Sequence, residues 1–299
     1  MDSFRQKTIS VVIATIVTYF SFQSLDLILS IYQVRTYFVV SWYVYAFHIF
    51  WLTFLFDLHL KTDGHFDRAR GRFNGVRLFF EAFKSRVRHL YHWSYLKHYL
   101  NYLILPSVFY WSVIILMHLN PFFELFKDVL IIMATGALVV VYWFFNIAFS
   151  RNMELHRTGL KVLALVKILA AVFSYTTLMA VGWYYGINLI VLLPVVFIIT
   201  SLLLYQMLFQ HKLVNISVYP AIIMFSILLT LVFTVIYQGW NVNYYTAGLM
   251  VAVVYNTCWG VLHQYLEKTL TRKVLWEYIF MMVVLVSIIL STHDFQGRI

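Results

Sequence analysis

The sequence predicts an all-α protein: a polytopic integral membrane helical bundle, with about nine transmembrane helices and one interfacial amphipathic helix. Three observations predict this fold. Hydrophobic residues make up 62% of the chain and charged residues only 11%, too few to coat a soluble domain. Apolar runs of about 20 residues, the length that crosses a bilayer, recur along the chain. These runs do not alternate between apolar and polar residues, which argues against a transmembrane β-barrel.

The apolar runs between charged breaks define the spans of what we treat as a single transmembrane domain, residues 1–299. The predicted spans are residues 8–31, 36–56, 99–119, 127–149, 160–184, 187–210, 216–238, 243–263 and 274–291. The first span follows Arg5 and Lys7 but has no small-residue cleavage pattern, so it is interpreted as a retained anchor. The single cysteine, Cys258, excludes an intramolecular disulfide framework.

The positions of lysine and arginine predict the orientation, because the spans were found without them. If the N-terminus is cytoplasmic, nearly all cationic residues fall on cytoplasmic segments, and only Arg35, Lys127 and Arg298 fall outside. This asymmetry follows the positive-inside rule and predicts an outside C-terminus. The net charge of +10 therefore indicates attraction to an anionic inner leaflet, and nucleic acid is not an expected partner.

Residues 57–98 form a long segment between the second and third spans, predicted to be a basic cytoplasmic loop followed by an interfacial helix. In the helix, Phe79 and Phe83 fall on one face, and Lys84 and Arg88 on the other. The stretch RHLYHWSYLKH, residues 88–98, contains three histidines, but the third lies on the opposite side of a helix from the first. These three imidazoles cannot bind one ion. Contact with lipid phosphates is the preferred interpretation, and the alternative is that two of the histidines contribute to a larger metal site.

Histidines and carboxylates gather at the predicted cytoplasmic ends of the spans. Neutral imidazole and carboxylate ligands suit iron, copper or zinc. The sharpest hypothesis places iron on His156, His211 and His263, with Glu267 or Glu277 orienting a ligand or transferring a proton. The alternative needs no metal, because polar side chains at helix ends reach water most easily.

Ionisable residues within the spans are a second indication of function, since each is costly in a bilayer unless paired or hydrated. They are Asp26, Lys167 and Glu277. Lys167 and Glu277 lie at similar predicted depths, so the sequence predicts an ion pair between them, although Lys167 could instead extend to the interface. Asp26 has no obvious partner at its level.

Three classes of function follow. The preferred one is an enzyme or binding protein for an apolar substrate (a lipid, isoprenoid or carotenoid) at the cytoplasmic leaflet, in its sharpest form an iron-dependent oxidoreductase. The second is a transporter or channel that uses Asp26, Lys167 and Glu277. The third is a structural subunit that assembles as an oligomer or with partner subunits. No phosphate loop, nucleophile elbow or CxxC motif decides whether the protein is an enzyme.

Overall fold

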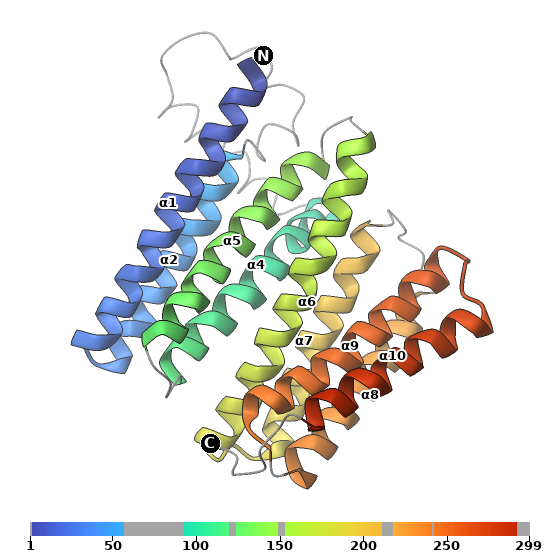
Figure 1. The fold of residues 1–299 in the computed structure, drawn as a ribbon. Coiled ribbons are helices and arrows are strands. Elements are labelled where there is room, and N and C mark those ends of the chain that lie inside the picture. The colour runs from blue at the N-terminus through green and yellow to red at the C-terminus, as the bar shows by residue number, and fades with distance from the viewer. Residues whose placement is uncertain are drawn as a thin grey trace. The chain divides into compact units, whose positions relative to one another are not determined.

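The computed structural model describes residues 2–56, 93–119, 124–148, 153–210, 218–240 and 242–291. Within these ranges the regular structure is entirely helical (Figure 1). The helices are α1 (Asp2–Ile31), α2 (Val34–Leu55), α4 (Trp93–Leu119), α5 (Glu124–Ala148), α6 (Met153–Tyr184), α7 (Leu189–Gln210), α8 (Tyr219–Gly239), α9 (Tyr244–Leu266) and α10 (Arg272–Ser291).

The predicted all-α fold is confirmed for the described residues, and each predicted span coincides with one helix. Seven of these helices are long and apolar enough to cross a membrane, the exceptions being α2 and α4. In α4 the described side chains cover a shorter apolar stretch, Leu103–Leu119. The chain is therefore a multi-pass helical membrane protein. Residues 57–92, with most of the predicted basic loop and interfacial helix, lie outside the described residues.

Local sequence explains where several helices begin and end. Pro220 lies in the first turn of α8, where its missing N–H has no intrahelical acceptor in any case. Asn243 caps α9, its side-chain oxygen accepting from the Tyr245 N–H at 2.9 Å. Gly186 turns the chain after α6 with a φ of 59°, and Lys268 does so after α9 with a φ of 58°.

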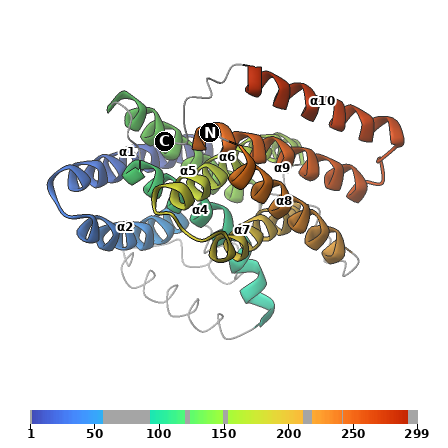
Figure 2. The same cartoon turned by 90° about the horizontal axis from the view of Figure 1, so that it is seen from below.

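The described chain divides into two compact units, which we describe separately. Unit 1 comprises Met1–Tyr110 and Glu124–Ala164, and unit 2 comprises Trp111–Phe123 and Leu165–Ile299. In unit 1, α1 packs against α2 and α5. In unit 2, α7 packs against α8, α8 against α9, and α9 against α10 (Figure 2).

Aromatic side chains form the core of unit 1. The Phe22 ring lies 5.8 Å from the His48 ring and 5.6 Å from the Tyr110 ring, measured between centroids. The Tyr110 hydroxyl donates to the Ser41 carbonyl at 2.9 Å, so this buried phenol satisfies its polar end. These contacts join α1, α2 and the unit 1 part of α4.

The stretch SYTT, residues 174–177 of α6, is the polar centre of unit 2. Ser174 bonds the hydroxyl of Ser112 at 3.1 Å, and Tyr175 bonds that of Thr200 at 2.8 Å. Thr176 packs against Gly248 of α9, where an added Cβ would collide with the Thr176 backbone. Small residues and hydroxyl pairs allow close packing in a membrane, where apolar surface drives helix association weakly. This stretch therefore joins α6 to the end of α4, to α7 and to α9.

Helix α10 contrasts with this centre. It contacts α9 but has no buried residue, whereas two-thirds of the apolar window of α6 is buried. Its exposed large side chains include Trp276, Phe280 and Val283. An exposed apolar face of this kind suits contact with lipid chains.

Candidate functional site

Of the three predicted metal ligands, His263 alone has a described side chain. His211 lies outside the described residues, and His156 lies in α6 where the backbone alone is described. His263 stacks on Trp259, with ring centroids 5.4 Å apart, and its Nε2 is 3.4 Å from Glu267 Oε1. The described ranges contain no group of three His, Cys, Asp or Glu side chains that could hold a metal.

The two predicted catalytic carboxylates, Glu267 and Glu277, do not lie in a buried site. Glu267 is the C-cap residue of α9, and its carboxylate lies beside His263. Glu277 is an exposed residue of α10. Carboxylates at helix ends are usually exposed or paired with a neighbour on the same helix. Neither feature indicates a catalytic environment.

Asp26 has a partner that the sequence analysis did not identify. Lys127 Nζ lies 3.1 Å from Asp26 Oδ1, and the two side chains are 24% and 28% exposed, respectively. The neighbouring residues also interact, since Gln23 donates to Asp128 at 3.3 Å. Asp26 therefore joins α1 to α5 within unit 1, and the expectation that it lacks a partner is wrong.

Lys167 is an ionisable residue that is buried inside unit 2. Its side chain is 1% exposed, and its Nζ donates to the backbone oxygen of Gln206 in α7 at 3.4 Å. The predicted ion pair with Glu277 does not form, because Lys167 is buried between helices and Glu277 is exposed on α10. The alternative that Lys167 extends to the interface is not observed either. Its ammonium form would be unpaired among the described residues, which is costly in the membrane interior.

A second buried polar residue lies in unit 1. His48 is 2% exposed, and neither ring nitrogen has a hydrogen-bond partner within the described part of the chain. Phe22, Phe47 and Tyr110 surround the imidazole with aromatic rings. A histidine in the middle of an apolar span was visible in the sequence, but its burial depends on packing between α1, α2 and α4.

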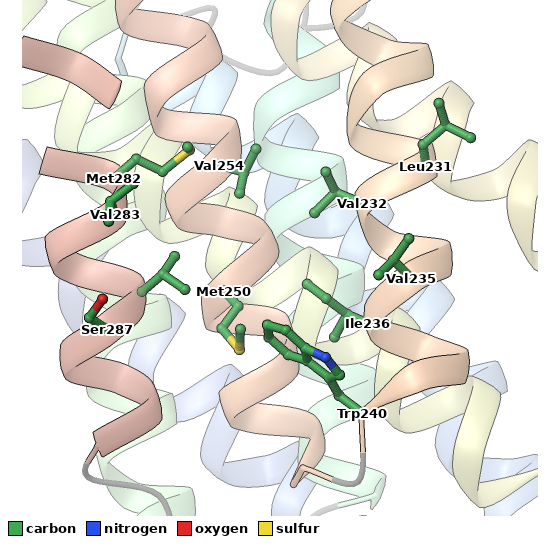
Figure 3. A pocket seen from close by; sticks show the side chains of 11 residues that line it. Leu231, Val232, Val235, Ile236, Trp240, Met250, Val254, Met282, Val283 and Ser287 are labelled. Carbon is green, nitrogen blue, oxygen red and sulfur yellow. The ribbon is translucent and has the colours of Figure 1, made fainter. Parts of the chain in front are cut away.

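One candidate binding site is an apolar groove in unit 2, with a volume of about 430 Å³ (Figure 3). Helices α8, α9 and α10 line it, and α9 forms its floor between the other two. Its residues are Leu231, Val232, Val235, Ile236, Trp240, Met250, Val254, Met282, Val283, Val286 and Ser287. The volume lies within the range of small-molecule sites.

The groove covers about half the length of its helices. From Leu231 to Trp240 the chain rises about 14 Å, roughly half of a 30 Å hydrocarbon core. Met250 and Val254 lie in the first half of α9, and the lining residues of α10 lie in its second half. The groove is thus at the opposite end of α9 and α10 from the turn that carries Lys268, Arg272 and Lys273.

A family model matches residues 77–292, about seven-tenths of the chain, and its description is "Protein of unknown function (DUF5656)". The chain belongs to this family. No curated protein and no solved structure matches the chain. Within this DUF5656 region lie α4 to α10, hence Lys167, the SYTT stretch and the groove, whereas α1, with Asp26, and α2, with His48, precede it.

Proposed function

We propose that the protein binds an apolar, lipid-like molecule in the groove between α8, α9 and α10. The observation that supports this most directly is the lining, in which nine of the eleven residues are aliphatic or methionine. A molecule would enter from the bilayer, because α10 has no buried residue and its large apolar side chains are exposed. The affinity would come from burial of apolar surface against three helices, where close packing replaces looser contacts with lipid.

The sequence analysis expected such a substrate at the cytoplasmic leaflet. The groove lies at the end of unit 2 away from the cationic turn at residues 268–273. We propose that this turn is cytoplasmic, that the N-terminus is also cytoplasmic and that the C-terminus is outside, which assigns the groove to the outer leaflet. Cysteine labelling tests this orientation, since Cys258 is the single native cysteine and is buried. Cysteines placed at Thr269 and Asn243 should react from opposite sides.

A matched pair of variants tests the groove itself. Val283 lines the groove, and Val284, its neighbour on α10, does not, although both valines are exposed. We expect Val283→Trp to block labelling of the groove by a photoreactive alkyl diazirine in nanodiscs, because the indole fills the space. Val284→Trp should leave labelling unchanged. Labelled peptides that map outside residues 231–287, or equal labelling of both variants, would contradict the proposal.

Iron-dependent oxidation of an apolar molecule is a separate proposal, because His263, Glu267 and Glu277 lie near the turn at residues 268–273, at the end of α9 and α10 away from the groove. It requires His156, His211 and His263 as ligands, with Glu267 or Glu277 beside them. The sequence pattern supports the oxidation proposal. The described geometry supports binding of an apolar molecule more strongly than it supports oxidation. Metal analysis of gently purified protein tests it: we expect close to one equivalent of iron, lowered by His263→Ala. Metal content near zero in the wild type would exclude this proposal.

Transport is a second candidate, favoured by the burial of Lys167. A buried amine with one carbonyl partner can exchange a proton or bind an anion as unit 2 changes conformation. Proton or solute flux in reconstituted vesicles should then be lost in Lys167→Met. Lys273→Met, which alters an exposed lysine, should retain the flux. Equal flux in both variants would exclude a role for Lys167 in transport.

A further inference from the structure

Two polar side chains lie at one end of the otherwise apolar groove. Trp240 follows the last residue of α8, and Ser287 lies one turn before the end of α10. Figure 3 shows them on opposite walls at the same end of the groove. This end coincides with the ends of the helices, where a membrane meets water and where lipids carry their first oxygen atoms.

Ser287 differs from other serines of unit 2 in its bonding. Serines in membrane helices usually donate to a carbonyl of the preceding turn, as Ser226 does to Ile222 and Ser291 does to Ile288, both at 2.8 Å. Within the described residues, neither the Ser287 hydroxyl nor the Trp240 indole N–H makes a hydrogen bond. Ser287 is also the sole polar residue between Ile279 and Leu290. Both groups are therefore available to a molecule in the groove.

The charge of the lining limits what that molecule can be. None of the eleven lining residues is ionisable, so an ionised group drawn into the groove would be desolvated without a counter-charge. The indole N–H can only donate, so it requires an acceptor, and a hydroxyl or ester oxygen meets this need without a charge.

We propose that the ligand is an uncharged long-chain lipid whose hydroxyl or ester oxygen is bound by Ser287 and Trp240. The inference rests on the proposed function and adds the chemical class of the ligand. The hydrocarbon chain would run from these two residues toward Leu231, near the middle of α8, and the oxygen would stay at the membrane boundary.

Four sixteen-carbon probes test the class, each competing with the alkyl diazirine for the full-length protein in nanodiscs. They are hexadecane, hexadecanol, methyl palmitate and palmitate. Hexadecanol and methyl palmitate should compete better than hexadecane, and palmitate should compete worst. Ser287→Ala should weaken the binding of hexadecanol about fivefold, which corresponds to about 1 kcal/mol for one hydrogen bond. It should leave hexadecane unchanged.

The outcomes separate this inference from the proposed function. If all four probes compete equally, the oxygen site is absent while the apolar groove stands. If palmitate competes best, the ligand is charged and the inference is wrong. If Val283→Trp fails to block labelling, the groove itself is not a binding site. Methyl palmitate cannot donate a hydrogen bond, so a preference for hexadecanol over it would assign the site to an alcohol. The reverse preference would assign it to an ester.

Discussion

Lys167 Nζ lies 3.4 Å from the backbone oxygen of Gln206, inside unit 2 where both side chains are 1% exposed. Among the described residues the amine has one neutral acceptor, which contributes little attraction to offset its desolvation. Two consecutive small residues, Ala170 and Ala171, follow it on α6 and are fully buried. The burial of Lys167 is therefore expected to lower the stability of the folded protein.

We predict that Lys167→Met raises the stability of the folded protein, by about 1–4 kcal/mol, because methionine fills a similar volume without a polar group. Thermal unfolding of the purified protein in one detergent measures this. Lys273→Met, at an exposed position, serves as the control and should change little. A lower unfolding temperature for Lys167→Met would mean that the amine has a strong favourable partner.

Gly248 should be intolerant of any side chain. A Cβ at this position would collide with the Cα and the nitrogen of Thr176, so α6 and α9 would have to separate. We predict that Gly248→Ala destabilises the protein by about 1–3 kcal/mol. Gly136→Ala is the matched control, since a Cβ there meets nothing within 4 Å and alanine favours the helix. Similar unfolding temperatures for the two variants would show that the contact is not close.

The ion pair between Asp26 and Lys127 should couple α1 to α5. Its side chains are about three-quarters shielded, so we expect an interaction energy near 1 kcal/mol, at the upper end for exposed pairs. A double-mutant cycle with Asp26→Asn and Lys127→Met measures this energy. The exchange Asp26→Lys with Lys127→Asp should recover part of the stability that either single reversal loses. Additive effects in the cycle would show that the pair makes no net contribution.

The turn between α9 and α10 contains a strained residue. Lys268 has a φ of 58°, in the left-handed region that glycine adopts without cost, while the N–H of Thr269 closes the turn on the Gln264 carbonyl at 3.0 Å. We predict that Lys268→Gly raises stability by about 1 kcal/mol. Lys268→Ala removes the same charge but keeps a Cβ, so it should give no such gain. Equal effects of both variants would attribute the change to charge.

The sequence predicted the helices better than the contacts between them. Spans were found because lipid demands long apolar runs with internally satisfied backbones, a one-dimensional requirement that can be counted along the chain. The partners of Asp26 and Lys167 could not be found in this way. A depth estimate assigned Glu277 to Lys167, but depth does not say which face of α10 points toward α6. That face depends on how α10 packs against α9 and on how α9 packs against α6.

The groove shows the same limit. Its residues are ordinary aliphatic members of three apolar spans, and nothing in their sequence separates Val283, which lines the groove, from Val284, which does not. The histidine pattern, in contrast, was conspicuous in the sequence. Yet the one described member of the predicted metal set, His263, is engaged locally with Trp259 and Glu267.

By itself, therefore, the sequence determined that this chain is helical and multi-pass and where its helices run, because hydrophobicity over about 20 residues is a local property. The tertiary structure alone decided that Lys167 is buried against Gln206, that Asp26 pairs with Lys127 and that three helices enclose a groove. The physical reason is that each of these features depends on the rotation of one helix against another. In a membrane, small residues and hydroxyl pairs set that rotation, as Gly248 and the SYTT stretch do here.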